Sequence, residues 1–391
     1  MYRYLLIIIT YSYINAQWMR QADFPGTLLR SANEISLDDK GFIFGGIKYN
    51  GQFSNHVWMY NSIDNYWIQK SDLPEYLTDT YIYNMPKFFN TSNHIYGMRN
   101  NNIYQYDHEN DNWILINSSY PGSYSALMPQ TIFTDNEHAY IGYGWYNSGT
   151  TYYPSATENE ELYKYNYILD SWEEIIGNDL FKLSNSNKFT FDGDNVFIWN
   201  GWWNQSDTTK IYRYNTYDYS LELITVVPFS LNGYLDYSDF IFFQNNIHIL
   251  GGMDELYDGW YADTTHFIYS LIDDIWYHGQ PALSSNLDYL GRANPVTFVF
   301  DNSIFCGLGM GSWNYDNLYN LHDDLWSLNN HDLIGDLNND GLVNISDALL
   351  LVTHVLGYSY LPDDVLIKSD IDYNEKIDIF DVLLITDIST N

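Results

Sequence analysis

Residues 41–74 read GFIFGGIKYNGQFSNHVWMYNSIDNYWIQKSDLP, and this stretch contains the pattern that decides the fold. A short apolar run ends in Gly45-Gly46, a later run carries Tyr60, and Trp67 follows Tyr60 by seven positions. Turn-forming residues separate the runs, which is typical of antiparallel strands joined by tight turns. The stretch therefore predicts part of one small four-stranded sheet.

The same tyrosine-to-tryptophan spacing recurs along the chain. The further pairs are Tyr106 with Trp113, Tyr165 with Trp172 and Tyr269 with Trp276, together with a degenerate pair, Tyr214 with Leu221. A strand that ends in glycine precedes each pair, and a sixth such strand ends at Gly307 and Gly309. The repeat length of roughly 50 residues is that of kelch-type propeller blades. Residues 17–331 thus resemble a six-bladed, all-β kelch propeller, in which the repeated Tyr and Trp are expected to pack between blades.

The last repeat unit lacks its fourth strand. Residues 17–25, QWMRQADFP, have the same form as residues 67–74, where the fourth strand of the first unit is expected. Pairing this N-terminal strand with the last unit would close the ring and remove an exposed sheet edge.

Two twelve-residue stretches near the C-terminus, Asp336 to Asp347 and Asp370 to Asp381, carry oxygen-bearing side chains at matching positions. Oxygen atoms at loop positions 1, 3, 5, 7, 9 and 12 are the ligands that a calcium loop supplies, position 7 through its backbone carbonyl. The predicted ligands of two Ca²⁺ sites are Asp336, Asn338, Asp340, Leu342, Asn344 and Asp347 in the first loop, and Asp370, Asp372, Asn374, Lys376, Asp378 and Asp381 in the second.

This pair of loops, each followed by a helical pattern and each closed by Asp rather than Glu, resembles the dockerin domain. The resemblance implies that residues 334–391 form a small all-α, calcium-binding module that attaches the chain to a cohesin domain. It also implies that the partner is contacted at loop positions 10 and 11, which are Ile345, Ser346, Ile379 and Phe380. The alternative is that Ile345 and Ile379 pack inside the module. The helical stripes expected in its core are Ala348, Leu349, Val352, Val355 and Leu356, and then Val382, Leu383, Leu384 and Ile388.

The composition and the first residues of the chain limit its possible partners and its location. With 16 basic and 50 acidic residues, the chain has a net charge of −34, which repels nucleic acid and anionic lipid surfaces. Residues 1–16 have the form of a secretory signal peptide, and no later segment is apolar enough to span a membrane. We therefore expect a secreted protein, either released or associated with the cell surface. The single Cys306 lies in an apolar strand pattern and is expected in the core.

Aromatic residues outside the repeat follow the glycine position of four units. They are Trp145, Tyr146, Trp202, Trp203, Trp260, Tyr261, Trp313 and Tyr315. In exposed loops on one face of the ring they are candidates for stacking against a sugar or a protein; the alternative is that they cover the ends of their own blades.

No catalytic motif stands out. The sequence favours a noncatalytic propeller that binds a ligand, with a role in polysaccharide binding or degradation. The alternative is a carbohydrate-active enzyme, catalysing glycoside hydrolysis or sugar epimerisation or mutarotation, carried by the same module.

Overall fold

The computed structural model describes residues 18–78, 86–91, 93–99, 101–116, 119–122, 128–135, 137–146, 157–158, 161–176, 188–200, 209–227, 234–256, 259–279, 291–300, 303–311, 313–314, 320–329, 335–338, 343–366, 368–371 and 376–390. The expected signal peptide, residues 1–16, lies outside this part of the chain. The chain divides into two compact units, residues 19–327 and residues 328–391 with 1–18. No helix of the described residues is both long and apolar enough to cross a bilayer.

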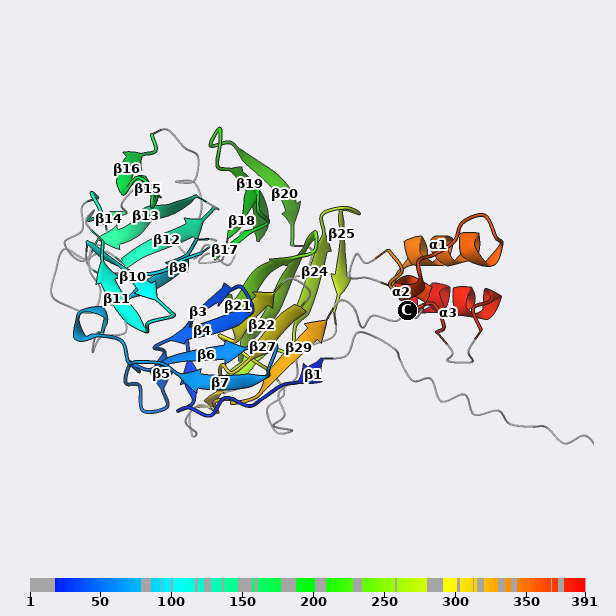
Figure 1. Cartoon of the computed structure of the whole chain (residues 1–391), viewed down its shortest axis with the longest axis horizontal. Coiled ribbons are helices and arrows are strands. Elements are labelled where there is room, and N and C mark those ends of the chain that lie inside the picture. Colours follow the sequence, from blue (N-terminus) through cyan, green and yellow to red (C-terminus); the bar gives the residue numbers. More distant parts are fainter. Residues whose placement is uncertain are drawn as a thin grey trace, which may run out of the picture. The chain divides into compact units, whose positions relative to one another are not determined.

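Six antiparallel sheets, each built on four strands, form the larger unit (Figure 1). The first three blades contain β3 (Asn33–Leu37), β4 (Lys40–Phe44), β6 (Val57–Asn61) and β7 (Tyr66–Gln69); β8 (Lys87–Asn90), β9 (Ile95–Arg99), β10 (Asn102–Asp107) and β11 (Asn112–Leu115); and β12 (Met128–Thr134), β13 (His138–Tyr146), β15 (Leu162–Asn166) and β16 (Ser171–Glu174). The next two contain β17 (Lys188–Phe191), β18 (Asn195–Asn200), β19 (Lys210–Asn215) and β20 (Leu221–Val226); and β21 (Tyr234–Phe243), β22 (Asn246–Leu256), β24 (His266–Ser270) and β25 (Ile275–His278).

The sixth blade joins the two ends of the propeller, as the sequence predicts. It consists of β26 (Val296–Phe300), β27 (Ser303–Gly307), β29 (Leu325–Asn329) and the N-terminal β1 (Met19–Arg20). In this sheet Met19 pairs with Ser327 and Arg20 with Trp326. The innermost strands contact one another in a closed circle, in the order β3, β8, β12, β17, β21, β26 and back to β3. The six-bladed propeller is therefore confirmed, including its closure by the N-terminal strand.

Small additional elements accompany the blades. They are β2 (Leu29–Arg30), which pairs with β5 (Ile47–Lys48), the short helix η1 (Glu75–Leu77), β14 (Thr157–Glu158), which pairs with β13, and β23 (Gly259–Ala262), which pairs with β22 and with β28 (Trp313–Asn314).

The repeated tyrosine closes a tight turn in four blades, the first, second, third and fifth. Its hydroxyl donates to the side-chain oxygen five residues later, over 2.9 Å from Tyr60 to Asn65 and from Tyr165 to Asp170. Tyr106 to Asp111 and Tyr269 to Asp274 make the same bond. Each acceptor residue has a positive φ of 46° to 57°, which Asn and Asp tolerate better than bulkier residues. The repeat therefore combines a left-handed turn residue with a buried aromatic ring that fixes it.

The fourth blade shows what the repeat does when it degenerates. Tyr219 occupies the turn position with a φ of 61°, where the other blades have Asn or Asp. The buried hydroxyl of Tyr214 has no hydrogen-bond partner in the described part of the chain. This blade keeps the aromatic packing but loses the bond that closes the turn.

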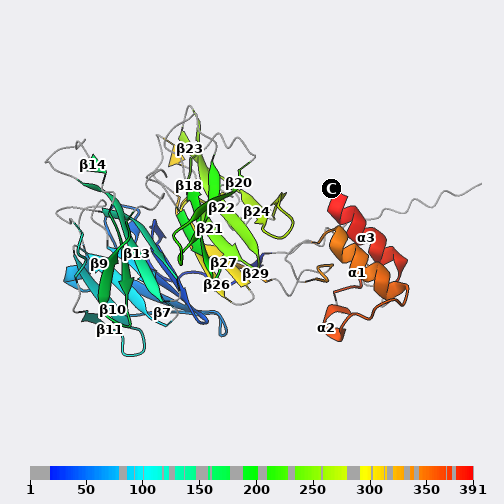
Figure 2. The same ribbon diagram turned by 90° about the horizontal axis from the view of Figure 1, so that it is seen from above.

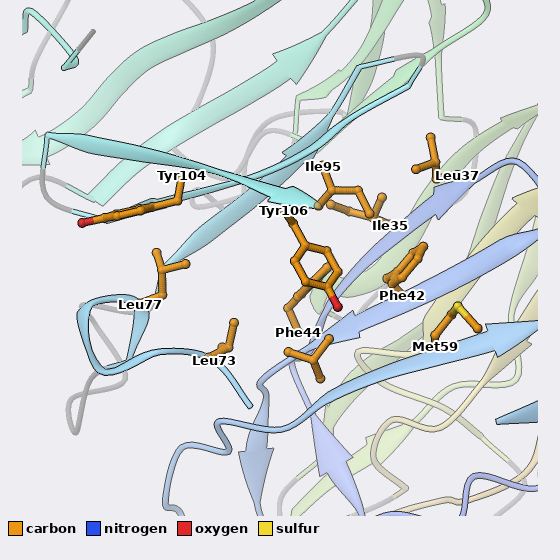
Figure 3. Close-up of a cluster of buried hydrophobic side chains, with 11 residues drawn as sticks. Ile35, Leu37, Phe42, Phe44, Met59, Leu73, Leu77, Ile95, Tyr104 and Tyr106 are labelled. Carbon is orange, nitrogen blue, oxygen red and sulfur yellow. The ribbon is translucent and has the colours of Figure 1, made fainter. Parts of the chain in front are cut away.

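Aromatic and aliphatic side chains fill the spaces between blades. Between the first two blades, Phe44 stacks on Phe88 with ring centroids 4.6 Å apart, and Tyr106 lies over Trp113 at 4.7 Å. The surrounding cluster of buried residues is drawn in Figure 3. The repeated Tyr side chains are buried, and Trp67, Trp113, Trp172 and Trp276 pack against the clusters between blades. Their predicted role in packing is confirmed.

The described part of the smaller unit contains three helices, α1 (Ile345–Val355), α2 (Asp363–Leu366) and α3 (Ile379–Thr390). Helices α1 and α3 lie side by side (Figure 2). Ala348, Leu351, Val382 and Ile385 form the centre of their interface. The helices expected after the two acidic loops are therefore present.

Candidate functional site

Loop positions 9 and 12 of the first acidic loop hold the start of α1. Asn344 is the N-cap residue, and its side chain accepts a hydrogen bond from the Ser346 amide at 2.7 Å. The fully buried Asp347 carboxylate accepts bonds from the Leu337 and Asn338 amides at 2.7 and 3.1 Å through one oxygen. Its other oxygen accepts from the Asn344 amide at 2.8 Å. One carboxylate thus fixes the helix to both ends of its loop.

The second loop repeats this arrangement. The buried Asp381 carboxylate accepts from the Ile371 amide at 2.8 Å and from the Asp378 amide at 2.8 Å. The Asp378 side chain accepts from the Phe380 amide at 2.8 Å, as Asn344 does from Ser346. The two stretches that match in sequence therefore match in hydrogen bonding, 34 residues apart in the numbering.

The predicted metal ligands suit a hard cation such as Ca²⁺, because each of them supplies an oxygen atom. Three of them, Asp336, Asp347 and Asp381, are fully buried carboxylates. A buried carboxylate is costly unless hydrogen bonds or a metal compensate its charge. Asn338 and Lys376 are exposed, and Asp370 and Asp378 are partly buried. Asp340, Leu342, Asp372 and Asn374 lie outside the described residues, and the described ones contain no convergent group of three or more His, Cys, Asp or Glu. Calcium binding stays a prediction.

Apolar side chains near the start of both helices face solvent. Ile345, Ile379 and Phe380 are 57%, 49% and 62% exposed, so Ile345 and Ile379 do not pack inside the module. Ser346 is partly buried. The predicted core was wrong for Leu349, Leu356 and Leu383, which are exposed because the interface between α1 and α3 is narrower than the apolar stripe of each helix. Each helix therefore exposes a further apolar side chain besides its predicted partner residues, Leu349 on α1 and Leu383 on α3.

The non-repeated aromatics lie partly in strands rather than in irregular loops. Trp145 and Tyr146 extend β13, Trp260 and Tyr261 belong to β23, and Trp313 belongs to β28. Trp260 and Trp313 are register partners across β23 and β28. Aromatic residues favour strands, which accounts for the added pairing. Trp202, Trp203 and Tyr315 lie outside the described residues.

Charged side chains in the inner strands form a site that the sequence reasoning missed. The innermost strands carry four charged residues, Glu34 on β3, Lys87 on β8, Lys188 on β17 and Asp239 on β21. Asp239 accepts a hydrogen bond from the Thr297 hydroxyl, and Lys188 donates to the Ser238 carbonyl on the next inner strand. A polar residue in a strand that is buried within a ring is the signal that would have found them.

Hydrogen bonds between inner strands show which of these charged groups lie at the same height along the inner strands. Ser36 on β3 accepts at its carbonyl from Asn90 on β8, at 3.1 Å, and at its hydroxyl from the Val299 amide on β26, at 2.9 Å. Inner strands of successive blades run in the same direction, so Glu34 and Thr297, two residues before Ser36 and Val299, lie at one level. Thr297 bonds Asp239, which places that carboxylate there also.

Four of the inner strands border a partly open cavity of about 260 Å³. Its polar wall residues are Glu34, Asn90, Thr134 and Thr190, from β3, β8, β12 and β17. Burial raises the pKa of Glu34 well above its ordinary value, the Asp239 charge raises it further, and Lys188 opposes the shift. Burial also lowers the pKa of Lys87. The raised pKa shifts Glu34 toward its protonated form, in which the carboxyl can donate a hydrogen bond, as an ionised carboxylate cannot.

Other buried polar groups are structural. Arg292 and Asp324 form an ion pair at 2.8 Å with side chains 2% and 1% exposed, and Trp326 donates to Asp324 at 2.9 Å. Cys306 is buried, as the sequence predicts, and burial raises the pKa of its thiol to about 12. Because the thiolate is the reactive form, Cys306 is unsuited to be a nucleophile.

Comparison with known proteins supports the fold and does not assign a family. No family model matches the chain, and no curated protein matches it. Among solved structures, that of YjhT is similar, with a TM-score of 0.52 and 12% sequence identity over 78% of this chain and 95% of that chain. At this identity the likeness shows a shared propeller fold alone.

Proposed function

We propose that this chain is an exported two-part binding protein. Its propeller recognises carbohydrate, and its C-terminal unit binds two Ca²⁺ ions and attaches the chain to a cohesin-type partner. The observation that carries the proposal is the twin geometry of Asp347 and Asp381, each of which anchors an acidic loop to the first turn of a helix. Two such loop-helix units fit a calcium-dependent adaptor of the dockerin kind.

The exposed apolar side chains support the docking role. Ile379 and Phe380 lie together at the start of α3, whereas the equivalent positions on α1 hold Ile345 and Ser346. Exposed apolar groups on a small, charged module are typical of a contact surface. Because the two pairs differ chemically, we expect one pair to dominate the contact.

The test uses the full-length protein and purified cohesin domains from the same genome. Ile379→Ala with Phe380→Ala should leave calcium uptake unchanged, because neither side chain supplies a ligand, and should weaken cohesin binding at least tenfold. Ile345→Ala with Ser346→Ala is the matched variant on α1. Binding that persists in excess chelator, or that survives both double variants, would contradict the proposal.

The alternative is a carbohydrate-active enzyme delivered by the same module. It is favoured by the raised pKa of Glu34 beside Asp239, since acid-base chemistry on sugars commonly uses a carboxyl of raised pKa near a second carboxylate. Release of reducing ends, or a change in optical rotation of a free sugar, should then occur with the parent protein and stop with Glu34→Gln. Unchanged binding with no turnover supports the recognition role.

A further inference from the structure

We propose that the cavity among the inner strands of the propeller holds one neutral, polyhydroxylated ring of monosaccharide size, bound through Glu34, Asn90, Thr134 and Thr190. The inference rests on the proposed carbohydrate recognition. It specifies where in the propeller the ligand binds and what charge it carries.

The cavity has the size and wall composition for such a ligand. Its volume of about 260 Å³ is slightly below the range of drug-sized pockets, and it suits one small ring. Phe88, Phe189 and Phe191 line it together with the four polar side chains. Phenyl rings match the C–H faces of a sugar, while polar groups from four successive blades surround its hydroxyl edge.

The polar groups have hydrogen-bonding capacity left for a ligand. The Asn90 amide nitrogen donates to the Ser36 carbonyl at 3.1 Å, which leaves the amide oxygen as an acceptor. The Thr190 hydroxyl oxygen accepts from the Phe242 amide at 2.7 Å, which leaves its O–H to donate. The wall therefore offers both a donor and an acceptor, which are what neutral hydroxyl groups require.

The charges argue against an ionic ligand. Among the described residues that line the cavity, Glu34 is the only titratable one, and no Lys or Arg is present to pair with an anion. Asp239 and Lys188 act on Glu34 with opposite charges from outside the lining, so they offset each other. The surroundings of the cavity therefore favour neither an anion nor a cation, which leaves a neutral ring as the ligand that the wall fits best.

The experiment compares probes that share one ring and differ in charge. Titration calorimetry on the full-length protein would use glucose, galactose and mannose as neutral probes, glucosamine as the cation and glucuronate as the anion. At least one neutral sugar should bind, and at least tenfold more tightly than either charged probe. Tighter binding of glucosamine or glucuronate would overturn the inference.

Variants then locate the site. Thr134→Phe should fill the cavity and abolish binding, whereas Leu223→Phe, which adds the same ring at an exposed position of β20, should not. Glu34→Gln should bind within threefold of the parent because the amide is neutral and donates, and Glu34→Leu should lose at least tenfold. Thermal melts would verify that each variant is folded.

The outcomes separate this inference from the proposed function. If polysaccharide or sugar binding survives Thr134→Phe and Glu34→Leu, the site lies elsewhere, and carbohydrate recognition by the propeller stands without the inference. If neither free sugars nor polysaccharides bind the parent protein, the proposed recognition fails and the inference fails with it.

Discussion

The propeller and the C-terminal unit hold their backbones in place by different means. In the propeller, buried aromatic rings such as Tyr60 and Tyr106 both fill the spaces between blades and fix the turns through their hydroxyls. The C-terminal unit has only a small apolar core. Two buried carboxylates, Asp347 and Asp381, add to it by accepting hydrogen bonds from backbone amides. A unit of this size buries limited apolar surface. Its fold should therefore depend on a few polar groups, whereas the propeller spreads its stability over many contacts.

Asp347→Ala should have the largest effect, and it tests whether the fold of the C-terminal unit depends on a single carboxylate. The substitution leaves three backbone amides without their charged acceptor, and each such bond contributes about 1.5–3 kcal/mol. The sum exceeds the stability of about 3–5 kcal/mol expected of so small a core. Calorimetry of the full chain should show the C-terminal transition lost and the propeller transition unchanged.

The control for this variant is Leu349→Ala on the same helix. Leu349 is 60% exposed, so its removal should change the free energy of unfolding by less than about 0.5 kcal/mol. A C-terminal transition that survives Asp347→Ala at an unchanged temperature would show that the carboxylate does not organise the unit.

A second variant tests the propeller at the point where its ends meet. Phe24 is 3% exposed, and its ring centroid lies 5.2 Å from that of Trp58 and 5.1 Å from that of Trp67. Truncating a buried Phe to Ala costs about 3–5 kcal/mol. Phe24→Ala should therefore lower the stability of the propeller by this amount without unfolding it, and leave the C-terminal transition where it was.

Arg20→Ala is the matched control in the same N-terminal segment. Arg20 forms an exposed ion pair with Asp23 at 2.9 Å, and such pairs contribute less than about 1 kcal/mol. Equal losses from Phe24→Ala and Arg20→Ala would mean that the segment closes the ring through its strand pairing, and that aromatic packing adds little.

Periodic features were predictable from the sequence because each blade repeats them. The spacing from Tyr60 to Trp67 recurs, and the similarity of residues 17–25 to residues 67–74 predicts the pairing of β1 with β29. The two acidic loops likewise predict the helices that begin at Ile345 and Ile379. In each case a motif that recurs within the chain indicates the contact, even where, as for β1 and β29, the partners are far apart in the sequence.

Contacts that no repeated motif marks were not predictable. The exposure of Leu349 and Leu383 depends on which part of each helical stripe meets the other helix. The pairing of Trp260 with Trp313 joins segments of two different blades. Glu34 becomes notable only because the ring brings Asp239 and Lys188 beside it. A single sequence contains these residues without indicating that they meet.

The smallest expected effect is a loss of stability at acid pH, and it should appear in the unfolding transition of the propeller alone. His322 is 3% exposed, its ring bonds the Gly291 carbonyl at 3.1 Å, and burial, with the nearby Arg292 charge, lowers its pKa to about 4. The unfolded chain keeps a pKa near 6.5, so below that pH it binds a proton that the folded protein excludes. Stability therefore falls as the pH drops from about 6.5 toward 4, by about 1.4 kcal/mol at pH 5.5.

Urea unfolding of the propeller at pH 7.5 and 5.5 would measure this loss. His322→Gln keeps a donor for the Gly291 carbonyl and has no proton to bind, so its stability should fall by about 1.4 kcal/mol less than that of the parent over this interval. His56→Gln is the control, because His56 is only partly buried, with 31% of its side chain exposed beside Asp72. An identical pH dependence in the parent and in His322→Gln would show that the buried imidazole is not the group that makes the propeller sensitive to acid. The C-terminal transition should coincide in all three proteins at each pH, because residues 328–391 contain neither substituted histidine.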